Sequence, residues 1–451
     1  MNQYSEITET IKRLAKRCER NDKFDQALYE KYDVKRGLRD QNGAGVVAGL
    51  TDISIVNGKR WEDDHWVSIP GELYYRGVDV RDLVKNYAGD HRGFEEAAYL
   101  LLFNKLPGRA ELDEFCDTLA EYRTLPTNFV RDVILKAPNG DIMNSLSRSV
   151  LTLYSYDTNA SDMSIENILR QCIQMIAVFP LLAVYAYQAH THYNEGNSLI
   201  IHPPKKAFST AENVLHMLRP DGNFTELEAR VLDIAFILHA EHGGGNNSTF
   251  TTRVVTSSGT DTYSAVTAAL CSLKGAKHGG ANQKVIEMFG DIKAHVSDWS
   301  DERALTDYID ALLDGRAGDR SGLIYGVGHA VYSVSDPRAE IFKGFVCKLS
   351  VEKGFEEEFA LYERVEKIAL DLIAKKRKIY KGVCVNVDFY SGLAYKMLNL
   401  PSELYTPIFA VSRIAGWSAH RIEELLNSSR IIRPAYVSVS HPVGYVKIDE
   451  R

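Results

Sequence analysis

The sequence predicts a mainly α-helical protein with a short β-hairpin region near residues 53–75. Apolar side chains recur at helical spacing through most of the 451 residues, most clearly in 95–103, 227–239, 263–273 and 361–373. Alternation of the kind found in strands is confined chiefly to residues 53–75, and the chain has no internal repeat or low-complexity linker. Together these patterns indicate a helical globular protein.

Three segments carry more specific expectations. Residues 1–40 include a charged, helix-forming stretch and predict an N-terminal helical arm. In the strand-like region, Asn57 and Gly58 are a favourable turn pair and predict the hairpin turn. Residues 175–187 are the most apolar run. Because this run is too short to span a bilayer and contains Pro180, it predicts a buried, kinked core helix.

Composition and charge exclude some classes of partner. With 45% hydrophobic and 25% charged residues, the chain is an ordinary globular protein with enough apolar residues for a large core. The net charge of −7 argues against a nucleic-acid partner, and no apolar run is long enough to predict a membrane partner. Six cysteines without Cys-x-x-Cys spacing, and no signal-peptide hydrophobic region, predict a reducing, cytoplasmic location.

Residues 239–278 are the most informative part of the sequence. His239 and His242 are three residues apart, which predicts that they share one face of a helix, and three glycines after His242 are expected to end that helix. His278 follows a second helix-like run and precedes two more glycines. Because histidine exchanges protons near neutral pH, histidines beside flexible backbone predict a polar pocket suited to acid–base chemistry.

Two other interpretations of these histidines are open. A single histidine on an apolar helix is usually a core or surface residue, and His-x-x-His spacing also occurs in metal sites. A catalytic zinc site ordinarily adds a third histidine or a carboxylate at a recognisable distance. The sequence contains neither His-Glu-x-x-His nor Cys-x-x-Cys. We therefore expect no metal at the site, with a histidine-based metalloprotein as an alternative.

Three further constellations place charged or titratable residues beside helix breaks. His329 follows a Gly-x-Gly sequence, and Arg338 comes nine residues later after Asp-Pro. Asp388 stands between an apolar run and Tyr-Ser-Gly, Arg413 lies in a helical apolar pattern, and Arg433 precedes a proline. A buried arginine is unfavourable unless it meets an anion. Taken alone, Asp388 is equally explained as a helix cap, and each arginine as part of a structural ion pair.

In this order, the four constellations resemble the citrate synthase family over about residues 43–437. The earlier segments GLTDISIVNG, PGELYYRGVDVRDLV and FEEAAYLLLFNKLP also match the family. The resemblance implies an acyltransferase that joins acetyl-CoA to oxaloacetate and hydrolyses the thioester to citrate and CoA, without a cofactor. It also implies a homodimer with a shared active site and two helical domains. The large domain would be residues 1–277 (1–40 being the arm) with 393–451, and the small domain residues 278–392.

The resemblance also implies a role for each residue singled out above. Asp388 is the implied base that removes the methyl proton, His278 the donor to the thioester oxygen, and His329 the acid that protonates the oxaloacetate carbonyl. The implied oxaloacetate contacts are His242, Arg338, Arg413 and, from the partner subunit, Arg433. Further implied contacts are Asn246 and Ser248, which orient His278 and the substrate, and Phe409, which lines the pocket.

The expected contacts to CoA depart from the family pattern. In many relatives a basic residue directly follows the second catalytic histidine, or lies a few positions on, and meets a CoA phosphate. Here Ala330 follows His329. A basic run upstream of Asp388 is the predicted replacement, with a solvated helix end as the alternative interpretation. The predicted CoA contacts are Lys375, Lys376, Lys378, Lys381 and Asn386.

Two alternatives for the activity differ from citrate synthesis. A 2-methylcitrate synthase, which uses propionyl-CoA, is the nearer one, because one extra methylene changes discrimination by only about 1–3 kcal/mol. A non-catalytic helical scaffold is the more distant one, beside the metalloprotein. A scaffold would be favoured if an acid, base or arginine position held an inert residue, and none does.

Overall fold

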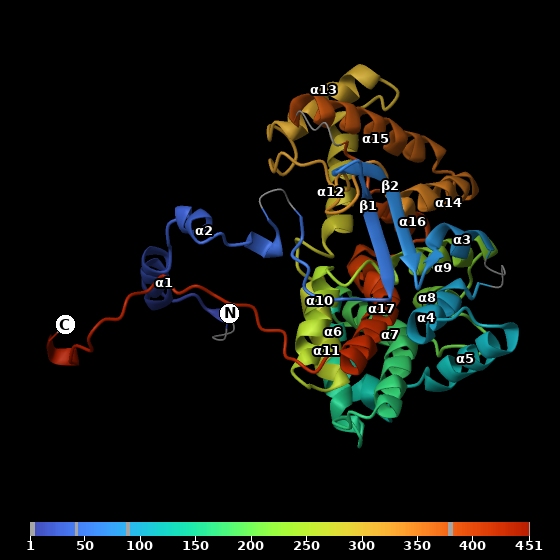
Figure 1. Ribbon diagram of the computed structural model, residues 1–451. Coiled ribbons are helices and arrows are strands. Elements are labelled where there is room, and N and C mark those ends of the chain that lie inside the picture. The colour runs from blue at the N-terminus through green and yellow to red at the C-terminus, as the bar shows by residue number, and fades with distance from the viewer. Residues whose placement is uncertain (1–4, 41–43, 87–90, 378–381, 451) are drawn as a thin grey trace. The chain divides into compact units, whose positions relative to one another are not determined.

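The computed structural model describes residues 5–40, 44–86, 91–377 and 382–450 (Figure 1). The chain divides into two compact units. The first is Met1–Leu50 together with Arg433–Arg451, and the second is Thr51–Ile432. The predicted boundary between a large and a small domain falls inside the second unit and stays a prediction.

Helices dominate the second unit, as predicted for a mainly α-helical protein. The first unit contains α1 (Glu9–Asn21), α2 (Ala27–Lys31), η2 (Arg36–Leu38) and η6 (Ile448–Glu450). The second unit contains the strands β1 (Ser54–Glu62), β2 (His65–Tyr75) and β3 (Val78–Asp79). Its helices are, in chain order, α3 (Val80–Asn86), α4 (Gly93–Phe103), α5 (Arg109–Tyr122), η3 (Val130–Ile134), α6 (Ile142–Leu153), η4 (Tyr154–Tyr156), α7 (Ile165–Glu195), α8 (Thr210–Leu218), α9 (Glu226–His239), α10 (Asn247–Ser257), α11 (Thr262–Leu273), α12 (Ala281–His295), α13 (Glu302–Leu313), α14 (Pro337–Lys353), α15 (Glu356–Arg377), α16 (Val387–Met397), η5 (Ser402–Leu404) and α17 (Tyr405–Asn427).

The four helical stretches predicted most clearly are confirmed as parts of α4, α9, α11 and α15. The charged stretch of the N-terminal arm forms α1, whose N-cap Thr8 accepts a hydrogen bond from the backbone N–H of Ile11. These segments form where expected because their apolar side chains recur at the helical period, and side-chain caps support the starts of α1, α9 and α11.

β1 and β2 form an antiparallel hairpin, but the predicted position of its turn is wrong. Asn57 and Gly58 lie inside β1, where the register of the pairing shifts. The chain turns instead at Asp63 and Asp64, whose φ angles of 46° and 62° suit a tight hairpin turn. Gly58 meets a different requirement, since a Cβ atom there would lie 2.4 Å from the carbonyl oxygen of Val331. Close approach of another segment therefore explains this glycine.

N-terminal caps stabilise the first turns of three helices that contribute residues to the candidate site. At α9, Thr225 and Glu228 form a capping box in which each side chain accepts a hydrogen bond from the other residue's N–H. Asp336 caps α14 by accepting from the N–H of Arg338, and a proline occupies the first helical position. Asn386 caps α16 in the same way. These caps fix the start of each helix relative to the cavity described below.

The core of the second unit forms around α7 and α17, which pack against each other. By length and composition α7 is apolar enough to cross a membrane, but 83% of its most apolar window is buried in the fold. Because that surface is covered by the protein itself, α7 is a core helix, as predicted for residues 175–187, and Pro180 lies inside it. α17 also packs against α4, α9 and α10.

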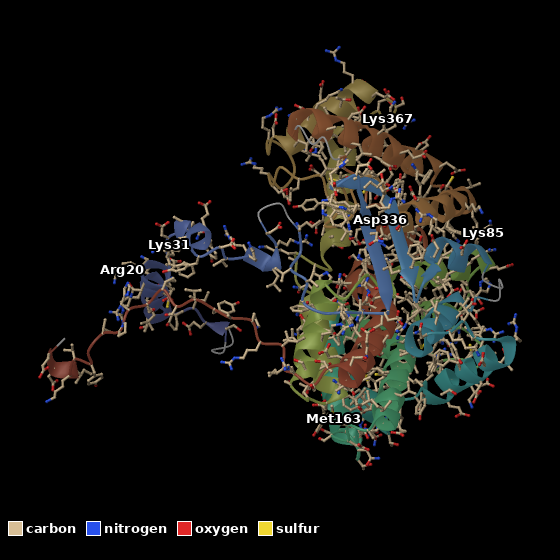
Figure 2. The ribbon with its side chains drawn as sticks, in the orientation of Figure 1. Arg20, Lys31, Lys85, Met163, Asp336 and Lys367 are labelled. Carbon is tan, nitrogen blue, oxygen red and sulfur yellow. The ribbon has the colours of Figure 1, made fainter. Side chains whose placement is uncertain are left out.

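Within the second unit, α12 to α16 gather at one end, and the hairpin of β1 and β2 runs alongside them (Figure 1). The hairpin packs closely on the segment that precedes α14. Gly71 donates its N–H to the carbonyl of Ser335 (3.1 Å), and a Cβ atom on Gly71 would lie 2.3 Å from that oxygen. Asp336, labelled in Figure 2, consequently lies beside the hairpin.

Candidate active site

A cavity of about 300 Å³ in the second unit collects most of the predicted site residues. It lies where the loop after α9, the turn after α11, the segment before α14 and the first turn of α16 meet α17. Residues far apart in the sequence therefore share one space. The predicted residues in its lining are His242, Asn246, His278, His329, Arg338, Asn386, Asp388, Phe409 and Arg413.

The two histidines three residues apart both line the cavity, although the predicted geometry is wrong. α9 ends at His239, so His242 lies in the following loop and the two side chains do not share a helix face. Gly243, in this loop, has a φ angle of +87°, which favours glycine over other residues. Burial lowers the pKa of His242 well below its usual range, helped by Arg338 and His329. The His242 ring is consequently neutral near pH 7.

Asp388 lies in the first turn of α16, and its backbone is tied to the loop before α14. Its N–H donates to Oδ1 of Asn386 (3.0 Å), and Nδ2 of Asn386 donates to the carbonyl of Gly328 (2.9 Å). The N–H of Asn386 also donates to the carbonyl of Gly326 (2.9 Å). Through these bonds the segment that carries Asp388 holds the loop that carries His329.

The carboxyl group of Asp388 has a raised pKa. Burial raises it to about 6, even though Arg338 and Arg413 act in the opposite direction. The shift arises because the low dielectric of the cavity disfavours the carboxylate more than the two guanidinium groups favour it. An ionised carboxylate with such a pKa is a stronger base than an exposed aspartate, and it remains ionised at neutral pH.

The tautomer of His329 follows from its hydrogen bonds. Its Nδ1 accepts from the backbone N–H groups of Val331 and Tyr332, each at 3.1 Å. Since a nitrogen that accepts from two N–H donors carries no proton, the proton of the neutral ring is on Nε2. The Tyr332 ring stacks on the His329 ring with centroids 4.6 Å apart. Backbone and stacking together fix both the orientation of His329 and the nitrogen that can donate.

His278 contacts Ser248, the residue predicted to orient it. The Nε2 atom of His278 lies 3.0 Å from Oγ of Ser248. Ser248 is buried, its Oγ lies 3.0 Å from Oδ1 of Asn246, and it accepts from the indole N–H of Trp417 (3.2 Å). Burial, with a smaller contribution from Arg413, lowers the pKa of His278 to about 4. A neutral imidazole is therefore held at the cavity wall.

Arg413 is a buried cation whose guanidinium is only partly engaged. Its Nε donates to the carbonyl of His239 (2.6 Å), and its guanidinium lies 4.6 Å from the ring centre of Phe409. Within the described residues, Nη1 and Nη2 have no hydrogen-bond partner, and Arg413 has no exposed surface. Burial lowers the pKa of Arg413 to about 10. Unpaired buried N–H groups on a cation at a cavity wall indicate an anion-binding site.

Arg338 is engaged differently. It forms a two-point ion pair with Asp336, with Nη2–Oδ2 at 2.7 Å and Nε–Oδ1 at 3.0 Å, and both side chains are buried. Neither bond uses Nη1. Asp336 thus holds the guanidinium in a fixed orientation at the cavity wall, in addition to capping α14.

Sequence reasoning missed Tyr332, which contacts both His242 and His329. Its hydroxyl lies 3.2 Å from Nε2 of His242 and donates to the carbonyl of Glu72 in the hairpin (3.3 Å). Since its ring also stacks on His329, one buried side chain contacts both histidines and β2. The position of Tyr332 three residues after His329 could have suggested a contact between these two residues. The contact to His242 could not be inferred, because the two residues are 90 positions apart in the sequence.

Other residues of the lining had no role assigned from the sequence, among them His239 and Lys277. His239 is buried, its Nδ1 has no hydrogen-bond partner within the described residues, and its ring lies 4.7 Å from that of Phe409. Lys277 is exposed and lies at the cavity directly before His278. The sequence offered no signal for Lys277, because the expected CoA contacts lay after His329 or in the basic run before Asp388.

The basic run predicted to meet CoA contributes little that the structure can describe. Lys376 pairs with Asp310 (2.7 Å) and Asp314 (2.5 Å), and Lys375 is exposed on α15, outside the cavity lining. These contacts fit the alternative interpretation of a solvated helix end. Lys378 and Lys381 lie outside the described residues. Arg433 is exposed and belongs to the first unit, so its predicted role stays a prediction.

The arrangement suits proton abstraction next to a carbonyl group. A carboxylate with a raised pKa can remove a weakly acidic C–H proton, while neutral imidazole donors stabilise the oxygen on which charge builds. The arginines suit a planar, doubly charged acid. In the part of the chain that the structure describes, no group of three or more histidine, cysteine or acidic side chains has an arrangement that could hold a metal ion.

Comparison with known proteins agrees with this chemistry. The family model described as citrate synthase, C-terminal domain, matches residues 41–435. A citrate synthase from Synechocystis sp. is 33% identical over 413 residues, which cover 90% of this chain and 93% of the relative. A 2-methylcitrate synthase from Shewanella oneidensis is 34% identical, over 90% of this chain and 95% of the relative.

The fold agrees as well. Citrate synthase from Thermoplasma acidophilum, solved as a ternary complex with carboxymethyl coenzyme A and oxaloacetate, matches with a TM-score of 0.77 and 27% identity. The match covers 93% of this chain and 99% of the solved one. A family match over most of the chain, relatives above 30% identity and a shared fold lead to one conclusion. This chain belongs to the citrate synthase family, whose members are condensing enzymes of the acyltransferase type.

Proposed function

We propose that this chain condenses acetyl-CoA with oxaloacetate and hydrolyses the product thioester to citrate and CoA. The observation that carries the proposal is the content of one cavity. It holds a carboxylate with a pKa near 6, neutral histidines with defined orientations, and a buried arginine with two nitrogens that have no partner among the described residues. The reaction needs a base, oxyanion donors and an anion clamp, and no cofactor beyond the CoA substrate.

Proton removal is the first difficult step, because the methyl group of a thioester is a weak acid. Asp388 takes this proton, and its raised pKa makes it a stronger base than an exposed aspartate. With Nε2 of His278 accepting the hydroxyl proton of Ser248, Nδ1 carries the ring proton and donates a hydrogen bond to the thioester oxygen as negative charge builds there. A neutral donor suits this role, because its own proton is not lost to solvent at neutral pH and it still polarises the carbonyl.

Carbon–carbon bond formation then needs a proton on the oxaloacetate carbonyl oxygen. His329 supplies it from Nε2, the nitrogen that the bonds from Val331 and Tyr332 leave protonated. Arg413 and Arg338 hold the two carboxylates, and a fixed position for the keto carbon removes orientational freedom from the reaction. Hydrolysis of the thioester completes the cycle in the same cavity.

Acetyl-CoA is favoured over propionyl-CoA as the acyl donor. Relatives at 30–34% identity over most of the chain include several named citrate synthase, and the solved structures that match are citrate synthases. The nucleotide part of CoA must lie outside the buried part of the cavity, where an ammonium group can meet a phosphate. Lys277, exposed at the cavity, supports such a contact better than Lys376, which is already paired with aspartates.

Release of free CoA thiol tests the proposed reaction. With purified protein and oxaloacetate, we expect faster thiol release from acetyl-CoA than from propionyl-CoA at equal concentrations. Each CoA ester without oxaloacetate is the control, because simple thioester hydrolysis needs no keto acid. Release that does not depend on oxaloacetate would contradict the condensation. A higher kcat/KM for propionyl-CoA would instead favour a 2-methylcitrate synthase.

We also propose that the active form is a cytoplasmic homodimer in which Arg433 completes the partner's site. Large apolar side chains of the first unit are strongly exposed, among them Ile7, Tyr436 and Val443, and a partner subunit is one way to cover them. Arg433 begins the C-terminal segment of that unit. An exposed arginine adjoining apolar residues suits an interface that adds a cation to a neighbouring site.

Mixed dimers test the shared site. When an Arg433→Ala chain is mixed with an Asp388→Asn chain, one site of each mixed dimer carries neither lesion, so thiol-release activity should recover from two nearly inactive parents. The matched control pairs Arg413→Met with Asp388→Asn. Both of these residues lie in the second unit, so no mixed site is intact and activity should stay low. Equal activity in the two mixtures, with mixed dimers detected by native mass spectrometry, would contradict the shared site.

A further inference from the structure

A buried chain of charged side chains lies next to the loop that carries His242, and the reaction steps above do not use it. Arg253 donates from Nε (3.0 Å) and Nη2 (2.6 Å) to Nδ1 of His420, and Nε2 of His420 lies 2.9 Å from Oε1 of Glu241. His420 and Glu241 have no exposed surface. Arg253 is itself held by Glu424 (2.9 Å) and by Glu423. The chain joins α10 and α17 to the loop after α9.

The direction of these bonds is fixed. A guanidinium group can only donate, so Nδ1 of His420 must accept and carries no proton. The ring proton is therefore on Nε2, and Nε2 donates to the carboxylate of Glu241. Arg253 thus selects the tautomer of His420, and His420 in turn holds Glu241.

Glu241 holds the backbone on both sides of His242. Its Oε1 accepts from the N–H of Gly243 (2.5 Å) and from the hydroxyl of Ser54 in β1 (2.9 Å). Its own N–H donates to the hydroxyl of Tyr75 in β2 (3.3 Å). With the residue before His242 and the residue after it both held, the His242 ring has a defined starting position at the cavity.

The same carboxylate affects Arg413 electrostatically. Glu241 is the strongest of the charged groups that raise the pKa of Arg413 against the effect of burial. The pKa of Glu241 falls to about 2 against burial, chiefly through His420 and with a smaller contribution from Arg413. Oε2 of Glu241 would lie 2.5 Å from a Cβ atom on Gly416, one turn after Arg413 in α17. Within the described residues that oxygen has no hydrogen-bond partner, and neither do Nη1 and Nη2 of Arg413.

We propose that Glu241, oriented by His420 and Arg253, is a positioning residue for oxaloacetate binding that fixes His242 and supplies the counter-charge for Arg413. This inference rests on the proposed function. A negative charge nearby keeps Arg413 ionised in a dry site, while the lack of a direct bond leaves Nη1 and Nη2 for the substrate. Oxaloacetate can then bind Nη1 and Nη2 of an arginine that is charged and buried.

Three variants separate a charge effect from a structural one. Glu241→Gln keeps the shape and an acceptor oxygen but removes the charge, and it should weaken oxaloacetate binding by about 10- to 100-fold. Glu241→Asp keeps the charge but shortens the side chain, so it should bind oxaloacetate more tightly than the Gln variant. Ser54→Ala removes one donor to the carboxylate, keeps its charge, and should weaken binding by only about 2- to 5-fold. The KM for acetyl-CoA should change by less than about threefold in all three, because Glu241 lies away from the thioester contacts.

The measurement is calorimetric titration of each folded variant with oxaloacetate alone, together with KM for both substrates and the melting temperature. Glu228→Gln is the matched control. Glu228 is another buried glutamate, bound by Arg219 (2.7 Å) and Lys353 (2.7 Å) away from the cavity, so its loss should lower the melting temperature and leave oxaloacetate affinity unchanged.

The outcomes distinguish the inference from the proposed function. Wild-type protein that does not bind oxaloacetate contradicts the proposed function itself. Wild-type binding with equal affinity in Glu241→Gln, or a Gln variant that binds more tightly than the Asp variant, overturns the inference alone. If Glu241→Gln does not fold, the other two variants decide. The inference is overturned if Ser54→Ala binds oxaloacetate with wild-type affinity and Glu241→Asp loses affinity only in proportion to its loss of melting temperature.

Discussion

Replacing Asp388 by asparagine is expected to lower kcat by about 10²–10⁴ while the protein stays folded and still binds oxaloacetate. Asparagine has almost the same shape, and the backbone N–H of residue 388 can still donate to Asn386 (3.0 Å in the wild-type chain). An amide, however, does not accept a proton from a carbon acid. Steady-state thiol release should therefore fall, while calorimetric titration with oxaloacetate should give nearly the wild-type affinity.

The pH dependence gives a second measure of the same residue. Because the pKa of Asp388 is raised to about 6, kcat/KM of the wild-type enzyme should rise with pH through about 6 and level off above it. The effect on stability has the opposite sign. The folded state favours the protonated carboxyl, so stability falls as the pH rises from the ordinary aspartate pKa of about 3.9 towards 6. Above pH 6 the Asn variant should be at least as stable as the wild type.

Asp233→Asn is the control for Asp388→Asn. Asp233 is fully buried, and it accepts hydrogen bonds from the N–H groups of Gly93 (2.9 Å) and Phe94 (3.0 Å) at the start of α4, away from the cavity lining. Its replacement should lower the melting temperature and keep kcat near wild type. If Asp388→Asn condensed the substrates at a near wild-type rate, or if both variants lost kcat equally, Asp388 would not be the base.

The helices and most of the candidate site could be predicted because their determinants are local. Apolar spacing predicts α4, α9, α11 and α15, side-chain caps support the starts of α9 and α11, and the glycine breaks mark where the chain opens to the cavity. The fit to the family's order of motifs then placed Asp388, His278 and His329 together, which spacing alone does not do. The structure adds the reason that Asp388 and His329 meet: Asn386 binds the carbonyl of Gly328 and joins the two segments that carry them.

What the sequence could not show depends on contacts between distant segments. The Asn57-Gly58 pair has a strong turn preference, but Gly58 lies inside β1 because the carbonyl of Val331 passes close to it. The role of Tyr332 requires His242 and β2 to be near, and the charged chain from Arg253 to Glu241 joins residues up to 179 positions apart. No local period or motif records such contacts, since each partner looks like an ordinary core or surface residue in its own segment.

Replacing Arg413 by methionine is expected to raise the KM for oxaloacetate by about 10²–10³-fold, which corresponds to about 3–4 kcal/mol of lost binding. Methionine fills a similar volume next to Phe409 but has no donors, so a substrate carboxylate would meet an apolar surface. Without substrate, the variant should melt at a temperature equal to or higher than the wild type, because the folded protein no longer buries a cation whose Nη1 and Nη2 are unpaired within the described residues. Adding oxaloacetate should stabilise the wild type and leave the variant unchanged.

Arg421→Met is the matched control, because Arg421 lies on the same helix, is equally buried, and has its donors satisfied. It donates to Thr262 (3.1 Å), to Thr256 (3.1 Å) and to the carbonyl of Thr260 (2.8 Å). Its loss leaves those groups without their partner, so the melting temperature should fall while oxaloacetate affinity stays near wild type. Opposite signs for the two substitutions follow from one difference between the arginines: the donors of Arg421 are paired within the fold, whereas Nη1 and Nη2 of Arg413 are paired only when substrate binds. If Arg413→Met were destabilised as much as Arg421→Met and still bound oxaloacetate, Arg413 would be a structural residue, and the anion clamp would have to lie elsewhere in the cavity.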